Sequence, residues 1–466
     1  MIQDKIDRLV LNIKKRIYFR ILGNSSPEKL MRLGDSVLIK RFKNAAENVP
    51  AYNQILKKRK INVKNIQNIE DFKRLPILSK EDLFPKFKVT DLCIGGNLKG
   101  MVSAFTSSGF SKNNFAYGMI TQRDIKNVKE TISFIFEKFF NAKNKTTMLI
   151  NANAMGVFFP SYYPLMNTGV RPDMILALLR GFKDNYKQFV VLCDPHFAKR
   201  IIDFGEESGF NWKSVEVSFI LGGDWVPQSL IKYLKRKLSE DSKIFVSMGV
   251  AEFGLNLFHN DLFLSNIREI VQNNPELRRE LFGDINVAPE IMYYYPMRTF
   301  VEVISTDENG FGNIILSNLD KHSKMPLMRY NTQDKAKIFD HNVFLKILKK
   351  HGISGKPTFN LPIISVLGRK NHCLKYKGKK ISIEEVKEAL YTNNEIAEKV
   401  TGYVFLNSSI IEVQLRENKE YDWKLKSKIE NEIYNLTGVR MPVKVYLYKD
   451  FPHGIGLDYE HKFKCV

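Results

Sequence analysis

Four segments, far apart in the chain, combine residue types that can bind a nucleotide. The first is Thr106-Ser107-Ser108-Gly109-Phe110-Ser111-Lys112, which follows a short apolar run. Clustered hydroxyls and a glycine make a flexible loop whose backbone N–H and hydroxyl groups can surround a polyphosphate. The plainer interpretation is an ordinary serine-rich turn. Phosphate binding is therefore a hypothesis that needs the other segments to support it.

The second segment is a pair in which glycines stand beside a carboxylate. It comprises Leu221-Gly222-Gly223-Asp224-Trp225 and Ser247-Met248-Gly249-Val250-Ala251-Glu252. Glycine has no side chain, so a flat ligand can approach the backbone closely. A carboxylate such as Glu252 can hold Mg²⁺ through phosphate oxygens. For Asp224 alone, an N-cap at the start of the following helix explains the residue equally well.

Two further segments with polar side chains lie in the C-terminal half of the chain. In Arg329-Tyr330-Asn331-Thr332-Gln333-Asp334, the carboxylate could accept both hydroxyls of a ribose, whereas a turn with an exposed aspartate is the alternative. Gly368-Arg369-Lys370-Asn371-His372 indicates a hinge, or a plain linker with solvated basic side chains. Beyond it, Ser382 and Glu385 have the spacing of a capping box and predict a helix.

The elements that must position these segments alternate between strands and helices. Buried strands are predicted at 148–151, 189–192, 218–221 and 244–247, with helices at 123–140, 196–208 and 227–238. This alternation favours right-handed crossovers and a mostly parallel sheet, in which ligands bind beyond the carboxyl ends of the strands. The glycine-carboxylate segments directly follow two of these strands, so we expect them at the binding edge.

Extended segments follow at 299–305 and 313–319, and a different pattern begins at residue 368. A basic hairpin, a helix at 383–391, two β segments within 400–416, a helix at 423–437 and a last strand at 443–448 predict a small α+β unit.

In order and spacing, the four segments resemble the adenylate-forming superfamily, and within it the branch of phenylacetate–CoA ligase-like, or CapK-like, proteins. Members carry a Ser/Thr/Gly phosphate loop, a Gly-Gly segment, a Tyr-Gly-x-Thr-Glu segment, an Arg-Tyr-x-Thr-x-Asp segment, a Gly-Arg hinge and a terminal lysine. Residues 49–52 and 75–83 also look like that branch. The resemblance implies an α/β fold: a large adenylate-forming domain with mixed, largely parallel sheets, and a small α+β C-terminal domain.

The resemblance also implies boundaries and roles. Residues 1–60 would be a basic helical segment of the large domain, 61–367 the AMP-binding part and 368–466 a mobile C-terminal domain. The implied ligands are ATP, Mg²⁺ and CoA. By position, the loop 106–112 would hold the β- and γ-phosphates, Gly222, Gly223, Asp224, Met248 and Gly249 would line the adenine, Glu252 would hold Mg²⁺, Asp334 the ribose hydroxyls, and Arg369 the ribose or phosphate.

Some positions depart from the family pattern. The phosphate loop has Phe110 and Asn113 in place of a threonine and a glycine, and Ala251 stands where the family prefers threonine. Asn371 and His372 replace the hinge acid. The family ending Pro-Arg-x-x-Gly-Lys is present as residues 452–457 with leucine at the lysine position, so Lys462 and Lys464 are the candidates for the catalytic lysine.

The resemblance therefore implies an ATP-dependent, AMP-forming ligase. It would adenylate a small carboxylic acid and pass the acyl group to CoA, a carrier-protein thiol, or an amine or hydroxyl acceptor. The aromatic-rich segment 155–163 is the candidate wall for an aryl acid, although core packing explains it equally well. The alternative is a catalytically degenerate member that acts as a binding or scaffold subunit in polysaccharide or specialised-metabolite biosynthesis.

Composition sets broader limits. The 466 residues contain 72 Lys and Arg against 50 Asp and Glu, a net charge of +22, and only four widely spaced cysteines. We expect a soluble, cytoplasmic protein without a disulfide framework. The charge suits CoA or an acidic carrier protein, or reflects lysine-rich composition alone. Aromatic residues do not interleave with the basic ones as a stacking groove for bases would require. A nucleic-acid-binding protein is therefore the third hypothesis, after the ligase and the binding or scaffold subunit. A homodimer is one option for the oligomeric state.

The first 60 residues are the most basic part, with fifteen Lys and Arg, five Asp and Glu and a net charge of +10. They predict two amphipathic helices. The first has apolar residues spaced by three and four. Such a helix usually packs on its own domain, and we expect that here; peripheral contact with an anionic membrane is the alternative. The apolar positions are Ile6, Leu9, Val10, Ile13, Ile17 and Ile21.

Overall fold

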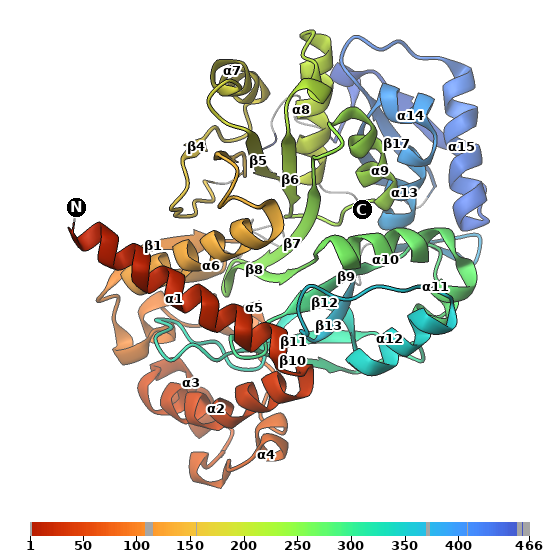
Figure 1. The fold of residues 1–466 in the computed structure, drawn as a ribbon. Helices are drawn as coiled ribbons and strands as arrows, with labels where there is room; N and C mark the ends of the chain where they lie inside the picture. The colour runs from red at the N-terminus through yellow and green to blue at the C-terminus, as the bar shows by residue number, and fades with distance from the viewer. Residues whose placement is uncertain are drawn as a thin grey trace.

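The computed structural model describes residues 2–107, 115–154, 156–369, 373–407, 409–453 and 459. Within these residues, one mixed sheet of 11 strands forms the centre of the molecule, in the order β10-β11-β12-β13-β9-β8-β7-β6-β5-β3-β4. A small α+β domain follows at the C-terminus, drawn in blue in Figure 1. The predicted fold class is confirmed.

One part of the sheet is parallel and matches the predicted strands closely. Its neighbours pair in register as β4-β3-β5-β6-β7. Their cores are continuous apolar runs, as expected for strands that are covered on both faces. The bounds are β3 Thr147–Asn151, β4 Leu165–Asn167, β5 Gln188–Cys193, β6 Val217–Leu221 and β7 Ile244–Val250.

The other part of the sheet is antiparallel from β7 to β10. It places residues 330–334 of the Arg329–Asp334 segment in a strand rather than a turn, because β12 begins at Tyr330. The first two residues of the predicted hinge segment, Gly368 and Arg369, lie in a strand, since β13 pairs with β12 as far as Arg369. The bounds are β8 Gly254–His259, β9 Glu290–Tyr294, β10 Thr299–Ile304, β11 Gly312–Asn318, β12 Tyr330–Phe339 and β13 Ile363–Arg369.

Helices surround the sheet, and their buried faces follow the apolar periodicity of the sequence. Thr121 and Asp124 form a capping box at the start of α6, which fixes where that helix begins. The bounds are α6 Gln122–Phe140, α7 Pro172–Phe182, α8 Pro195–Glu207, α9 Gln228–Lys237, α10 Leu262–Asn273, α11 Pro275–Phe282 and α12 His341–Lys350.

The N-terminal segment forms three helices where the sequence indicated two, because Pro50 starts a separate helix after the extended Val49. Helix α1 lies along α6 (Figure 1), where Phe19 stacks on Phe134 with ring centroids 4.1 Å apart. The bounds are α1 Ile2–Asn24, α2 Pro27–Asn48, α3 Pro50–Lys58, α4 Ile69–Lys73 and α5 Lys80–Leu83, followed by the separate hairpin of β1 Met101–Thr106 and β2 Tyr117–Thr121.

The C-terminal domain contains a hairpin, a three-stranded sheet and helices. The predicted capping box of Ser382 and Glu385 is confirmed at the start of α13. The bounds are β14 Cys373–Tyr376, β15 Lys379–Ser382, α13 Ile383–Thr392, α14 Asn394–Lys399, β16 Val400–Leu406, β17 Ile411–Leu415, α15 Trp423–Thr437 and β18 Val443–Tyr446.

The C-terminal domain shares one hydrophobic core with the parallel part of the sheet, reaching from Met148 on β3 to Tyr459. The contact also caps a helix across the interface. The Glu388 carboxylate on α13 accepts the backbone N–H groups of Gln228 and Ser229, at 2.8 and 2.9 Å, at the start of α9. These N–H groups have no partner within their own helix, so a negative charge here satisfies them and the helix dipole together.

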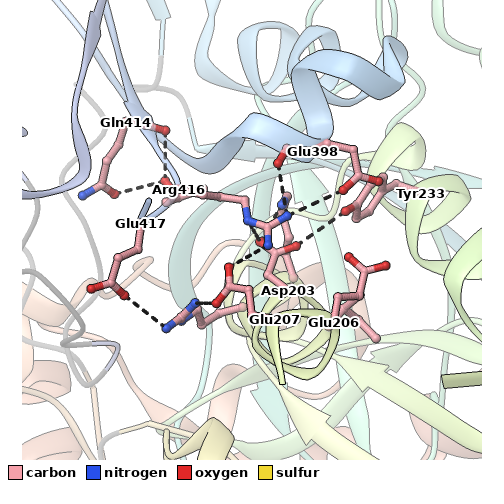
Figure 2. A network of polar contacts seen from close by, with 12 residues as sticks. Asp203, Glu206, Glu207, Tyr233, Glu398, Gln414, Arg416 and Glu417 are labelled. Carbon is pink, nitrogen blue, oxygen red and sulfur yellow. Dashed lines mark hydrogen bonds and ion pairs between the residues drawn. The ribbon is translucent and has the colours of Figure 1, made fainter. Parts of the chain in front are cut away.

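Buried charges join the same two parts of the chain (Figure 2). Arg416, which follows β17, pairs with Asp203 and Glu207 of α8 through its Nε and Nη2 atoms, at 3.1 and 2.7 Å. Asp203 also accepts a hydrogen bond from Lys199 Nζ at 2.7 Å. Lys199, Asp203 and Arg416 are all buried. The position of the C-terminal domain therefore depends on charge pairing as well as on apolar packing.

Candidate functional site

A cavity of about 1490 Å³ lies at the carboxyl ends of the parallel strands, and the described part of the chain places all four predicted segments around it. The phosphate-loop candidates contribute Thr106 and Ser107, and β12 contributes Asp334. Strands β6 and β7 contribute the glycine-carboxylate pair. The predicted site residues of this pair all line the cavity: Gly222, Gly223, Asp224, Met248, Gly249 and Glu252.

Some predicted site residues lie outside the described part of the chain. These are Ser108, Gly109, Ser111, Lys112, Asn371, His372, Lys462 and Lys464. The backbone of Arg369 is described, and it pairs with Asp334 across β12 and β13. Since adjacent strands bring paired residues within a few ångströms, this pairing places the backbone of Arg369 beside that of Asp334, the residue assigned to the ribose from the sequence.

A lysine that the sequence analysis did not assign to the site contacts the phosphate-loop segment. Lys80, the first residue of α5, donates from Nζ to Ser107 Oγ at 3.0 Å. Lys80 lines the cavity as well. The Ser79–Asp82 capping box fixes the start of α5 and so holds this lysine in place. That four-residue pattern, beside the resemblance at 75–83, is the signal that could have indicated Lys80.

Close backbone packing positions the glycine-carboxylate pair. A Cβ atom on Gly222 would lie 2.6 Å from the carbonyl oxygen of Ser247, and one on Gly118 of β2 would lie 2.0 Å from that of Ala251. Neither distance is compatible with a side chain. The glycines therefore let the chain after β6 pack against Ser247 and let β2 pack against Ala251. These two contacts fix the backbone position of Glu252 in the cavity wall.

Glu252 is also held from its side chain and from the turn that follows it. The Tyr330 hydroxyl donates to Glu252 Oε1, and burial together with this carboxylate raises the pKa of Tyr330. The half-buried Arg298 donates to the carbonyl oxygens of Phe253, Leu255 and Asn256 at 3.1 to 3.3 Å. Satisfying three carbonyls with one guanidinium fixes the β7–β8 turn, so Glu252 is preorganised.

Asp224 is not the helix N-cap that the sequence allowed, because α9 begins at Gln228 after Pro227. Its Oδ2 atom instead lies 2.6 Å from Lys387 Nζ on α13 and 3.4 Å from His196 Nε2. Burial opposes ionisation of Asp224, but Lys387 and His196 outweigh burial and hold its pKa well below the usual range. Lys387 also lines the cavity, so the C-terminal domain reaches the site.

Arg329 has a structural position rather than one in the cavity wall. Its Nε and Nη2 atoms pair with both carboxylate oxygens of Glu302 at 3.2 and 3.0 Å, and Nη1 donates to the carbonyls of Lys73 and Leu75. Both charged groups are buried. The residue ties the segment after α4 to β10 and β12, and thereby fixes the strand that carries Asp334.

Aromatic side chains line another part of the cavity. From the predicted wall 155–163, Val157, Phe158, Phe159 and Pro160 reach it, and α6 adds several phenylalanines. The side chain of Asn151 fixes this loop by donating to the carbonyl oxygen of Val157 at 2.8 Å. The cavity thus combines a polar edge at the strand ends with an apolar compartment.

The cavity lining contains a buried histidine, His259, whose burial makes the stability of the protein depend on pH. Within the described residues, neither ring nitrogen of His259 has a hydrogen-bond partner, and the ring stacks on Tyr295. Burial, with help from Arg298, lowers the pKa of His259 from 6.5 to about 4. The folded state therefore binds fewer protons than the unfolded chain between these values, and stability falls as pH falls through this window.

We expect His259→Phe to remove this acid sensitivity. Relative to pH 7, the wild-type protein should lose about 2 kcal/mol more unfolding free energy than the variant at about pH 4.5. Urea titrations at the two pH values measure the difference, and the variant at pH 7 controls for packing. Equal losses in both proteins would show that His259 is not held neutral by burial.

Comparisons with known proteins identify the fold. No family model and no curated protein match the chain. Among solved structures, 2-hydroxyisobutyryl-CoA ligase in the postadenylation state with 2-HIB-AMP is similar, with 14% identity, a TM-score of 0.65 and coverage of 94% of this chain and 89% of the other. At this identity the similarity shows the fold alone. That fold is the one predicted for adenylate-forming ligases.

Other structures of the same enzyme differ in their similarity to this chain according to the state in which they were solved. In the thioesterification state with 2-HIB-AMP and CoA, the TM-score is 0.53 with 13% identity, covering 94% of this chain and 90% of the other. With R3-HIB-AMP in the postadenylation state the TM-score is again 0.65, with 13% identity and 94% and 89% covered. The arrangement described here is therefore closer to the postadenylation structures.

Proposed function

We propose that the chain is an ATP-dependent, AMP-forming ligase of the phenylacetate–CoA ligase-like branch. The observation that carries the proposal is that four segments, far apart in the sequence, meet at one cavity beyond the parallel strands. This edge is where open α/β sheets bind ligands. The similar fold of a CoA ligase solved with 2-HIB-AMP and CoA supports the same activity.

In this proposal the chain's polar groups bind and orient ATP. Thr106, Ser107 and Lys80 line the cavity and would bind the β- and γ-phosphates; Lys80 Nζ donates to Ser107 Oγ. The backbone at 222–224 and 248–249 would line the adenine, and Asp334 would accept hydrogen bonds from the ribose hydroxyls. The acid's carboxylate would then attack the α-phosphorus, forming an acyl adenylate and releasing pyrophosphate. Positioning and charge stabilisation supply most of the catalysis in such a step.

Glu252 fits a magnesium site that phosphate oxygens complete. Its carboxylate lines the cavity, and one oxygen is oriented by Tyr330. The described residues contain no group of three or more His, Cys, Asp and Glu side chains that could hold a metal ion. One carboxylate together with substrate phosphates is a common way to bind Mg²⁺. When bound, the ion would offset the negative charge of the phosphates.

The acid and the acceptor are proposed from the remaining surfaces. The aromatic compartment around Phe158 and Phe159 suits an apolar acyl group, aryl groups included. The net charge of +22 suits the phosphates of CoA or an acidic carrier protein as the acceptor. We propose residues 368–466 as a mobile domain with its hinge at Asn371 and His372, and Lys462 or Lys464 as the lysine for adenylation.

Acid-dependent exchange of labelled pyrophosphate into ATP tests the proposal. With a panel of aryl and aliphatic acids, we expect exchange with one acid class, and a loss of at least about a hundredfold in Glu252→Gln, which removes charge and keeps shape. Lys462→Ala and Lys464→Ala identify the lysine. Calorimetry separates the outcomes. ATP binding without exchange for any acid would favour a degenerate binding or scaffold subunit, and absence of both would refute the proposal.

A further inference from the structure

Helix α1 has two apolar faces, and only one of them packs on the protein. On the packed face, Phe19 stacks on Phe134 of α6, and Lys15 Nζ lies 2.5 Å from Glu137 Oε1. Leu22 is buried on the same side, and Leu11 lines the cavity. The spacing of these residues, four or three apart, places them on one face of the helix.

Helix α1 packs on its own domain as expected, but four of the six apolar residues that the sequence analysis named lie on the other face and do not pack. The side chains of the remaining two, Ile6 and Leu9, lie outside the described part of the chain. Val10, Ile13, Ile17 and Ile21 are 43, 49, 53 and 39% exposed. They are spaced by three and four residues and are all exposed, so they form one stripe along α1, the red helix in Figure 1. Single exposed apolar residues are common, but four aligned on one helix indicate a contact surface.

Basic residues accompany the stripe. Arg16 and Arg20 are exposed on the neighbouring face of α1. Residues 1–60 as a whole carry a net charge of +10. An apolar stripe beside exposed arginines is the composition of helices that lie in the interface of an anionic bilayer. No helix among the described residues is long and apolar enough to cross a membrane.

We propose that this stripe, Val10, Ile13, Ile17 and Ile21, is a docking surface for an anionic membrane, with α1 lying parallel to the bilayer plane. The side chains would enter the boundary between headgroups and acyl chains, while Arg16 and Arg20 would reach lipid phosphates. A second copy of the chain fits less well, since four side chains of one helix cover much less than the roughly 800 Å² per partner of a stable interface.

Vesicle sedimentation tests this assignment. The probe is vesicles of roughly three parts phosphatidylcholine to one part phosphatidylglycerol, with pure phosphatidylcholine vesicles for comparison. We expect the full-length protein to bind the anionic vesicles, and Ile13→Asp/Ile17→Asp to reduce that binding at least about tenfold. The matched control is Ile270→Asp/Val343→Asp, which changes two apolar residues of similar exposure on α10 and α12 and should bind like wild type.

A charge variant separates the electrostatic contribution. Arg16→Ser/Arg20→Ser should lose roughly tenfold in affinity for the anionic vesicles, and added salt should weaken the wild type in the same way. Thermal melts check that each variant is folded. Failure of the wild type to bind anionic vesicles, or equal binding by Ile13→Asp/Ile17→Asp, would overturn the proposal. So would a concentration-dependent dimer that this variant abolishes.

Discussion

Replacing Asp334 with alanine is expected to weaken ATP binding by roughly a hundredfold to a thousandfold. The carboxylate lies in the cavity wall and is 9% exposed, so water cannot easily take the place of its ligand. In the proposed complex it accepts two ribose hydroxyls, and hydrogen bonds to a charged group contribute about 1.5–3 kcal/mol each. Titration calorimetry with ATP measures the change in Kd.

Three comparisons define what that loss means. Asp334→Asn keeps the shape but accepts hydrogen bonds with one oxygen and no charge, so we expect an intermediate affinity. Asp284→Ala removes a carboxylate that is 95% exposed and should leave the Kd unchanged. Replacing ATP with inorganic tripolyphosphate, which has no ribose, should remove the difference between wild type and Asp334→Ala. Unchanged ATP affinity in Asp334→Ala would remove the ribose assignment.

The strands that carry the site could be predicted because their signal is local. Each predicted parallel strand is a short apolar run between turn residues, and the structure extends those runs by one to three residues, as in Gln188–Cys193 and Ile244–Val250. Continuous apolar runs form only where both faces are covered, so sequence, burial and sheet position agree. Parallel topology then brings the 222–224 and 248–252 segments to one sheet edge, whereas Asp334 and the phosphate loop reach it from antiparallel strands and a separate hairpin.

The sequence alone does not show which element packs on a given helix face, or which residue pairs with a given charged side chain. Periodicity in α1 identifies residues that share a face but not which face meets α6, and the more regular stripe is the exposed one. Asp224 and Lys387 are 163 residues apart, and nothing local to either residue predicts their 2.6 Å contact. Arg329 belongs to a motif that suggests chemistry, yet its guanidinium holds Glu302 in the interior.

The same dependence on distant partners gives Asp203 its expected importance. We expect Asp203→Ala to lower the free energy of unfolding by about 3–5 kcal/mol, since removing one member of a buried ion pair leaves the other charge unpaired. Lys199 is fully buried, and Asp203 is the carboxylate that its Nζ contacts within the described residues. Arg416 keeps Glu207, so the larger part of the loss comes from Lys199. Urea unfolding of the full chain measures it.

The pH dependence of this loss distinguishes a stranded charge from a simple cavity. Burial already lowers the pKa of Lys199, and without Asp203 it should fall further. The folded variant then binds fewer protons than the unfolded chain, so its stability should rise with pH and the deficit should shrink between about pH 7 and pH 9. Glu206→Ala, on the same helix but at the interface rim, is the matched control and should cost under about 1 kcal/mol.

A deficit that does not change with pH would mean that lost packing, rather than charge, dominates at this site. The triple replacement Lys199→Met/Asp203→Leu/Arg416→Met tests this from the opposite direction, because apolar groups of similar volume often match or exceed a buried ionic cluster in stability. We expect the triple variant to recover most of the unfolding free energy that Asp203→Ala loses. Because the cluster joins α8 to the C-terminal domain (Figure 2), recovery would show that this contact does not require charge for its stability.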